Sequence, residues 1–316
     1  MSIVSKTETD SAAMQRMRDL LVRTSRTFAL SIPLLPEPTR TAVCLSYLLF
    51  RVVDTLEDAP AWKRDERTHA LLDFSELACS PSVAGAERNR RVWLARSPTS
   101  DTGCHDLLEA FPLLIGSLQR ISPEVRGQIF AHCRRTALGM REALVAADPS
   151  GQFRLESLRE LRAYCYVVAG IVGELLTTIF VHDAPALRAV EPTLRHHQVE
   201  FGEGLQLVNV IKDEQIDRSE GRVYLPGDVS RQQVFALARD DLRHAQHYIQ
   251  ALERGAAPAG FVAFTTLPVR LARVALKHLE KHGPGAKVPR ALVQRILHGV
   301  QRSTHSVHSA SAQSGK

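Results

Sequence analysis

Two segments of the chain carry carboxylates at spacings that suit metal chemistry. In the first, FRVVDTLEDAP, Asp54, Glu57 and Asp58 are three or four residues apart, so a helix places all three on one face. Like charges stacked in this way repel by about 0.2–0.5 kcal/mol per pair on an open surface, so stability alone does not explain them. Clustered hard oxygen ligands suit Mg²⁺. The competing interpretation is a solvated acidic helix end before Pro60.

The second segment, GLQLVNVIKDEQIDRSEGRVYLP, places Asn209, Asp213 and Asp217 at positions i, i+4 and i+8. Successive members drift by about 40° around an α-helix, so the three side chains share a broad face. Both acidic sets follow apolar helical stretches, and we expect them to converge across a cavity in a helical bundle. A di-iron site is the alternative, but it requires Glu-x-x-His pairs that neither segment provides.

Helical periodicity extends over most of the chain. Apolar residues at i, i+3, i+4 and i+7 spacing form a stripe over residues 42–56, which predicts a helix of about 18 residues. Similar patterns predict helices over 66–77, 107–118, 123–146, 157–179, 195–217, 230–251 and 267–282, with a last one after Pro289. No segment alternates convincingly as a strand does. The predicted fold class is therefore all-α, in one domain over residues 11–301, with disordered tails at 1–10 and 302–316.

Composition narrows the class of protein further. The 316 residues are 44% hydrophobic and 23% charged, which excludes a mostly disordered, collagen-like or disulfide-scaffold chain. The net charge of +6 is compatible with nucleic acid, an anionic membrane surface or an anionic substrate. Basic residues do not cluster with aromatic ones, so we expect no nucleic-acid partner.

Targeting and redox features are inconspicuous. The polar N-terminal segment lacks the apolar core of a signal peptide. We expect no transmembrane helix, because the most apolar run, residues 167–181, contains Glu174 and is predicted to be a buried core helix. Five widely spaced cysteines are typical of reduced thiols in a cytoplasmic protein.

Five motifs, in order and spacing, resemble the squalene/phytoene synthase family of head-to-head prenyl synthases. They are TSRTFALSI (24–32), YLLFRVVDTLED (47–58), YCYVVAGIVGELLT (164–177), GLQLVNVIKDEQID (204–217) and GRVYLP (221–226). DTLED and FTTLPVRLARVAL are more similar to the squalene synthase branch than to the phytoene branch. The resemblance implies a single helical-bundle isoprenoid synthase fold of class I, with a central cavity, Mg²⁺ and prenyl diphosphate substrates.

The same resemblance implies roles for particular residues. Six would bind Mg²⁺: Asp54, Glu57, Asp58, Asn209, Asp213 and Asp217. The aspartates among them, with Tyr164, would be catalytic. Substrate would contact Ser25, Arg26, Phe28, Tyr47, Arg51, Gln206, Lys212, Arg222 and Tyr224. NADPH would contact Arg26, Arg51, Lys212, Lys287 and Arg290. For Lys287 and Arg290, the competing interpretation is a solvated basic surface. For Tyr164 and Tyr224, it is packing in the protein core.

Two positions depart from the family pattern. Lys212 stands where the family usually has Arg, which keeps the charge but loses bidentate contact with a diphosphate. Ile216 stands where the family often has Glu, although Glu214 is close by. Both departures concern the detailed geometry of the predicted Mg²⁺ site. Gly170 and Gly173 narrow one side of their helix, which predicts a close helix approach or a kink.

The expected reaction is the condensation of two farnesyl diphosphates, through presqualene diphosphate, to squalene with reduction by NADPH. Alternatives are phytoene formation from geranylgeranyl diphosphate and dehydrosqualene formation without NADPH. A non-catalytic relative that binds prenyl diphosphates is an alternative of a different class. Because such products partition into bilayers, peripheral membrane association is expected for an otherwise cytoplasmic protein. The sequence does not indicate an oligomeric state.

Overall fold

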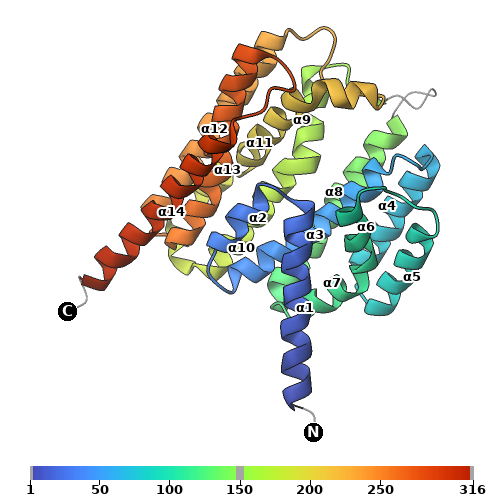
Figure 1. Ribbon diagram of the computed structural model, residues 1–316, viewed down its shortest axis with the longest axis horizontal. Helices are drawn as coiled ribbons and strands as arrows, with labels where there is room; N and C mark the ends of the chain where they lie inside the picture. Colours follow the sequence, from blue (N-terminus) through green and yellow to red (C-terminus); the bar gives the residue numbers. More distant parts are fainter. Residues whose placement is uncertain (1–2, 147–152, 314–316) are drawn as a thin grey trace. The chain divides into compact units, whose positions relative to one another are not determined.

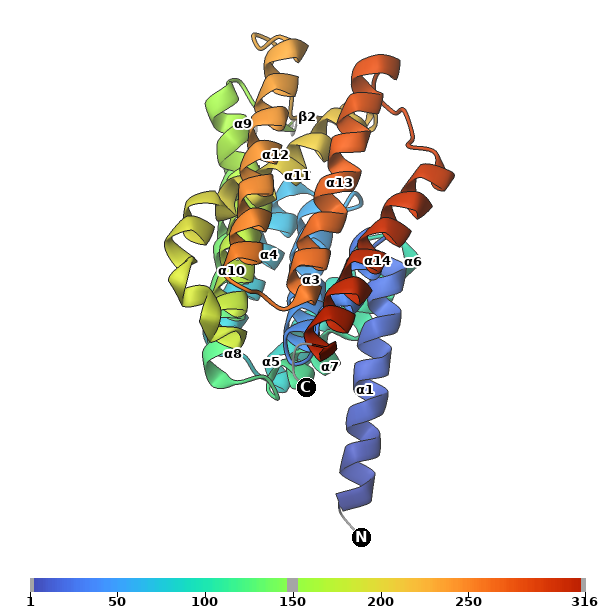
Figure 2. The ribbon, with the colours of Figure 1, turned by 90° about the vertical axis from the view of Figure 1, so that its left-hand side faces the viewer.

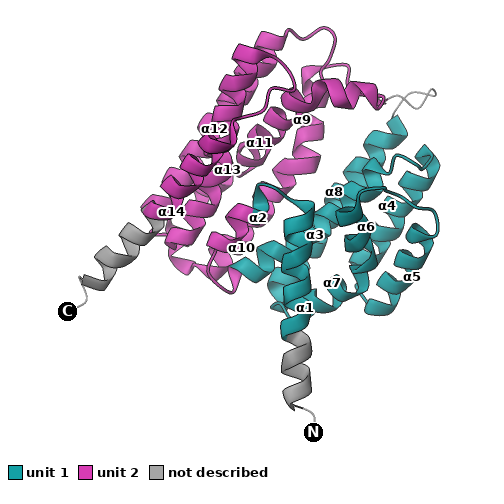
Figure 3. Ribbon diagram, viewed as in Figure 1, with its two compact units in different colours: residues 1–29, 40–146 teal, residues 30–39, 147–316 magenta. Residues whose placement is uncertain are grey.

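The structure is a computed structural model that describes residues 3–146 and 153–313, with side chains described for 11–146 and 153–302. It is an assembly of α-helices with two strands of two residues each in the described part (Figure 1). The all-α fold class predicted from periodicity is confirmed. The chain divides into two compact units, residues 1–29 with 40–146 (unit 1) and residues 30–39 with 147–316 (unit 2) (Figure 3).

Unit 1 contains the helices of the first half of the chain. They are α1 (Ile3–Thr24), α3 (Thr39–Asp58), α4 (Arg64–Cys79), α5 (Val83–Leu94), α6 (Thr102–Glu109), α7 (Phe111–Leu118) and α8 (Pro123–Ala146). The short α2 (Phe28–Ser31) follows α1 and leads into unit 2, to which the 3₁₀ turn η1 (Ile32–Leu34) belongs. The core includes Phe111, whose ring centroid lies 5.2 Å from that of Trp93 and 6.2 Å from that of Phe74. All three rings are fully buried, so aromatic packing joins α4, α5 and α7.

Unit 2 contains the second half. Its helices are α9 (Leu158–Cys165), α10 (Ile171–Asp183), α11 (Glu191–Ser219), α12 (Arg231–Arg254), α13 (Ala259–His282) and α14 (Arg290–Gln313), with a π-helical segment η2 (Tyr166–Gly170) and a 3₁₀ turn η3 (Pro185–Ala189). Helices α11, α12 and α13 lie side by side (Figure 2). Phe180 stacks on Phe261 with ring centroids 4.3 Å apart, which fixes α10 against α13.

Several predicted boundaries shift for physical reasons. The pattern over 107–118 is divided into α6 and α7, because Pro112 has no N–H and stands at the start of a helix. The pattern over 157–179 is interrupted by the π-helical η2. Helical backbone covers residues 3–10 and 302–313, and the expected disorder of the tails at 1–10 and 302–316 stays a prediction. The expected single domain over 11–301 stays a prediction.

The two strands were absent from the sequence prediction. β1 (Phe153–Arg154) pairs in parallel with β2 (Arg222–Val223), and the N–H groups of Phe153 and Leu155 donate to the carbonyls of Gly221 and Val223. Strands of two residues are too short for alternation to show in a sequence. Their effect is to hold the segment after α11 beside the segment before α9.

Glycines allow α11 to approach η2 and α10 closely. A Cβ atom on Gly173 would lie 1.9 Å from the carbonyl oxygen of Gln198, and one on Gly202 would lie 2.0 Å from that of Ala169. Real Cβ atoms never come this close to backbone, so only glycine fits at either contact. The predicted close approach at Gly173 is confirmed.

Two stretches, Leu158–Asp183 and Ala259–His282, are long and apolar enough by composition to cross a membrane, although the sequence prediction contained no such helix. They are also 61% and 50% buried within the protein. Burial in a helical core produces the same composition, and the predicted burial of the apolar run 167–181 is confirmed in α10, where Leu175, Ile179 and Phe180 are buried. These stretches are therefore weak evidence for a spanning segment.

Candidate active site

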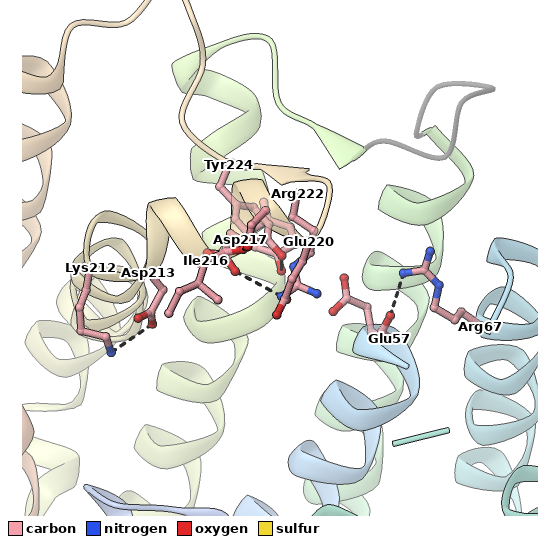
Figure 4. A network of polar contacts seen from close by, with 11 residues as sticks. Glu57, Arg67, Lys212, Asp213, Ile216, Asp217, Glu220, Arg222 and Tyr224 are labelled. Carbon is pink, nitrogen blue, oxygen red and sulfur yellow. Dashed lines mark hydrogen bonds and ion pairs between the residues drawn. The ribbon is translucent and has the colours of Figure 1, made fainter. Parts of the chain in front are cut away.

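The acidic end of α3 is positioned by a fully buried apolar stripe. Leu48, Val52 and Val53 have no exposed surface, and the carboxylates follow them in the last turn. Glu57 is buried at 6% exposure, and Asp54 and Asp58 are half-buried. The guanidinium of Arg67 donates to the backbone carbonyl oxygen of Glu57 at 3.3 Å, which holds this helix end against α4 (Figure 4). All three carboxylates lie in the last two turns of α3, and their role as metal ligands stays a prediction.

Arg51 partly compensates the charge of Asp54. Its Nη1 atom lies 3.7 Å from Oδ2 of Asp54, and its Nη2 atom donates to the Sγ atom of Cys104 at 3.5 Å. Burial raises the pKa of Asp54 to about 6, Arg51 opposes that shift, and the neighbouring Asp58 adds to it. A cation near this carboxyl group would therefore stabilise its ionised form.

The SRTF segment is fixed against α3 through Tyr47. The Tyr47 hydroxyl donates to the carbonyl oxygen of Thr24 at 2.9 Å, and its ring centroid lies 5.4 Å from that of Phe28. The backbone N–H of Phe28 donates to Oγ of Ser25 at 2.9 Å, which closes the turn between α1 and α2. Burial raises the pKa of Tyr47, while Ser25 and Arg51 lower it. Arg26, in the middle of this turn, is exposed.

On α11, Lys212 lies between two of the expected metal ligands. Its Nζ atom is 3.1 Å from Oδ1 of Asn209 and 3.1 Å from Oδ2 of Asp213 (Figure 4). The side chains of Lys212 and Asp213 are 42% and 39% exposed, so a soluble ligand can reach both. Gln206, one turn before Asn209, is half-buried. The lysine ammonium therefore neutralises part of the charge of Asp213 and also donates to Asn209.

The end of α11 carries a second ionic group around Arg222. Its Nη2 atom lies 3.3 Å from Oδ1 of Asp217 and also bonds Glu220 (Figure 4). Asp217 is 15% exposed and Arg222 20% exposed, so solvent screens this pair less than it screens Lys212. Glu214 instead pairs with Arg218 and Arg231, and Ile216 is 58% exposed. Glu214 therefore does not replace the glutamate that the family often has at position 216.

Tyr164 and Tyr224 are brought together by the two short strands. Their hydroxyl groups are 3.2 Å apart, their ring centroids are 4.8 Å apart, and Phe153 of β1 packs on both rings. Both tyrosines are 8% exposed. Tyr224 and Arg222 also line a small pocket beside Asp217. Core packing and contact with a ligand are therefore both compatible with these two side chains.

The loop after α13 is attached to α11 next to Lys212. The N–H of Gly285 donates to the backbone carbonyl of Lys212 at 3.1 Å, and φ angles of +86° at Gly283 and +76° at Gly285 give the loop its turn. Lys287 follows on this loop, Arg290 is the first residue of α14, and both are exposed. Sequence reasoning did not anticipate the contact, because a backbone hydrogen bond between distant segments leaves no trace in side-chain pattern.

The expected metal ligands belong to both units, three to α3 and three to α11. Among the side chains described, His105, Asp106 and Glu109 already have ligand atoms within 4.8 Å of one another. Asp106 is engaged by Arg16 and Arg23, so this group is an ion-pair cluster rather than the predicted site. The predicted convergence of the two acidic sets stays a prediction.

The fold is that of the all-α isoprenoid synthases. The structure of TcSQS with the ligand BPH1237 superposes with a TM-score of 0.71 at 22% identity, over 92% of this chain and 86% of that one. A dehydrosqualene synthase in complex with a ligand gives a TM-score of 0.59 at 18% identity, over 95% of this chain and 99% of that one. At such identities the likeness establishes the fold alone.

Sequence comparison gives the family. The family model for squalene/phytoene synthase matches residues 21–234, and this chain therefore belongs to the squalene/phytoene synthase family. Squalene synthase of Schizosaccharomyces pombe is 29% identical over 219 residues, which are 68% of this chain and 45% of that protein. Squalene synthase of Bos taurus is 28% identical over 232 residues, 71% of this chain and 49% of that protein. The chain thus spans about half the length of these relatives.

Proposed function

We propose that this chain condenses two molecules of farnesyl diphosphate head to head, through presqualene diphosphate, to squalene. The observation that carries the proposal is the pairing of carboxylates with basic side chains on both α3 and α11. Asp54 lies beside Arg51, and Asp213 lies beside Lys212. The family match covers both helices. A prenyl diphosphate needs cations around its leaving group, and each helix supplies them beside groups that can hold a metal ion.

The donor set fits Mg²⁺. Carboxylate and amide oxygens of Asp54, Glu57, Asp58, Asn209, Asp213 and Asp217 are the hard ligands that this ion prefers. The raised pKa of Asp54 indicates a carboxyl group that gains from an added cation. When bound, Mg²⁺ supplies charge neutralisation for the departing diphosphate.

The chain's own residues bind and orient the substrate in this proposal. Arg51, Lys212 and Arg222 contact diphosphate oxygens, and Arg26 adds a charge from its exposed turn. The apolar stripes that precede the acidic groups exclude water, which would otherwise quench the allylic cations as alcohols. The hydroxyl pair of Tyr164 and Tyr224 orients the diphosphate and assists transfer of the proton lost on closure of the cyclopropane ring, which a diphosphate oxygen accepts.

NADPH fits the surface beside Lys212. Lys287 is an exposed cation on the loop that the Gly285 hydrogen bond attaches to α11, and Arg290 is an exposed cation at the start of α14; two such cations suit the phosphates of a dinucleotide. When bound, NADPH supplies the hydride that reduces the final cation. Residues 287 and 290 would then be needed for squalene formation but not for presqualene diphosphate formation.

The deciding experiment is incubation of the purified chain with farnesyl diphosphate and Mg²⁺, with and without NADPH, and in parallel with geranylgeranyl diphosphate. Squalene with NADPH, and presqualene diphosphate or dehydrosqualene without it, are expected. Phytoene from the longer substrate would instead assign the phytoene branch. Binding without turnover of either substrate would identify a non-catalytic relative and refute the proposal.

Matched variants test whether product formation depends on the assigned residues. Asp54→Asn and Asp213→Asn each keep side-chain size and remove a charge, and we expect product formation to fall at least a hundredfold. Asp240→Asn is the control, because Asp240 pairs with Arg243 on the solvent-exposed face of α12. Equal activity in all three variants would contradict the metal roles.

We further propose a cytoplasmic protein that associates peripherally with membranes, since its product partitions into bilayers. The proposed partners are prenyl diphosphates and no nucleic acid. Flotation with anionic vesicles at low and high salt tests this, because surface attraction is screened by salt. Extraction only with detergent would contradict a peripheral association.

A further inference from the structure

Four histidines meet where α11 packs against α12. His196 and His197 come from α11, and His244 and His247 come from α12. The Nδ1 atoms of His197 and His244 are 3.0 Å apart. The His197 ring centroid is 4.6 Å from that of His196, 5.0 Å from that of His244 and 5.2 Å from that of His247. The cluster lies wholly within unit 2 and outside the proposed active site.

The electrostatic surroundings keep the central imidazole neutral. Burial, followed by the three neighbouring histidines, lowers the pKa of His197 to about 4, although Glu200 opposes the shift. Glu200 follows His197 by three residues on α11, so it lies on the same helix face. A buried carboxylate oxygen of Glu200 has no hydrogen-bond partner in the described part of the protein. Glu200 also interacts with Arg162, so the 3.0 Å approach of the two Nδ1 atoms of His197 and His244 is the feature that indicates a site for an added cation.

We propose that His197, His244 and His247 form a binding site for a divalent transition-metal ion of the Zn²⁺ class, bridging α11 and α12. Imidazole nitrogen suits Zn²⁺, Cu²⁺, Ni²⁺ and Co²⁺, whereas Mg²⁺ prefers oxygen. Two nitrogens on one tetrahedral Zn²⁺ stand about 3.3 Å apart, close to the observed separation of His197 and His244. His247 is exposed and reaches the ion by rotating its side chain, and water completes the coordination.

The alternative for this cluster is a set of hydrogen-bonded, metal-free histidines. One Nδ1 atom of His197 and His244 would then donate to the other. Metal binding differs from this alternative in two measurable properties, the number of metal ions bound per chain and the absorption spectrum of bound Co²⁺. A tetrahedral Co²⁺ complex has visible absorption bands that free Co²⁺ lacks, and their presence reports coordination directly.

The experiment uses the full chain after removal of metal with EDTA. Zn²⁺ is titrated by calorimetry, and Co²⁺ by visible absorption, in a background that carries His278→Gln and His282→Gln. Those residues form another close histidine pair, on α13, with ring centroids 4.3 Å apart. His305→Gln and His308→Gln remove the histidines near the C-terminus. We expect one equivalent of Zn²⁺ and a rise of several degrees in Tm.

Three variants and a control decide the outcome. His197→Gln, His244→Gln and His247→Gln should each weaken Zn²⁺ binding at least tenfold, whereas His69→Gln on α4 should not change it. His247 is exposed, so its variant folds even if the more buried ones do not. Absence of binding in the parent protein, or undiminished binding in these variants, would overturn the proposal. Neither measurement involves a prenyl substrate, so failure here is separate from failure of the proposed function.

Discussion

Replacement of Arg162 by methionine tests how strongly the stability of the protein depends on the one arginine that pairs with two buried carboxyl groups in unit 2. Nη2 of Arg162 lies 2.8 Å from Oε2 of Glu203, and Nη1 lies 3.3 Å from Oδ1 of Asp241. The two acidic side chains are 4% and 1% exposed, while Arg162 reaches solvent at 36%. The variant keeps the aliphatic contacts of the arginine and removes the charge that α9 supplies to α11 and α12.

The pKa values set the size and the pH dependence of the effect. Burial raises the pKa of Glu203 to about 7 and that of Asp241 to about 6, although Arg162 lowers both. Because these values exceed those of the unfolded chain, the folded state binds more protons, and stability falls as pH rises from about 4 to about 7. Without Arg162 both groups stay protonated to higher pH. One pKa unit corresponds to about 1.4 kcal/mol. Keeping both carboxyl groups protonated therefore lowers the free energy of unfolding of the variant, relative to wild type, by at most about 3 kcal/mol at pH 7.5 and by a few tenths of a kcal/mol at pH 5.5.

The assay is urea unfolding, followed by circular dichroism, of wild type and Arg162→Met at both pH values. We expect the destabilisation to be larger at pH 7.5 by about 2–3 kcal/mol. Arg195→Met is the control, because the exposed pair of Arg195 with Glu191 is worth at most about 1 kcal/mol at either pH. A destabilisation that is equal at the two pH values, or larger at pH 5.5, would refute the reasoning.

Three further results are expected. Gly173→Ala should lower stability by about 2 kcal/mol, measured by denaturant unfolding, because its Cβ would meet a backbone oxygen of α11 at 1.9 Å; an unchanged midpoint would contradict that contact. By carboxyl NMR, Asp54 should titrate near pH 6 and move higher in Arg51→Met, which removes the charge that lowers its pKa; a lower midpoint would show the opposite sign. Tyr248→Phe should cost about 1 kcal/mol in the same unfolding assay, since its hydroxyl bonds that of Thr177 at 3.0 Å and Thr177 keeps its own backbone acceptor; a loss above 3 kcal/mol would indicate a different role.

Much of the fold follows from local periodicity. The range predicted for α8 coincides with the observed Pro123–Ala146, and α3, α11 and α12 extend only a few residues beyond their patterns. Each of these helices buries a regular apolar face, which a sequence shows directly. Helix α5 went unpredicted, since its charged residues weaken the pattern, and the two-residue strands are too short to produce one.

The contacts of the candidate site likewise fall into those that the sequence could predict and those that it could not. Contacts within a helix, such as Arg51 with Asp54 and Lys212 with Asp213, depend on spacing alone and could be inferred. Contacts between distant segments could not. The Tyr164–Tyr224 pair depends on strand pairing, and the attachment of residue 285 to α11 is a backbone hydrogen bond.

The sequence by itself determined the helical class, the acidic and basic helix faces and the family motifs, because these are properties of neighbouring residues. Only the tertiary structure decided which charges are buried together. Nothing in the sequence indicates that one arginine, Arg162, pairs with the carboxyl groups of both Glu203 and Asp241. The histidines of α11 and α12 likewise form a cluster only through the register of two packed helices. Such register is set by the whole core, including the glycine contacts, and no local pattern encodes it.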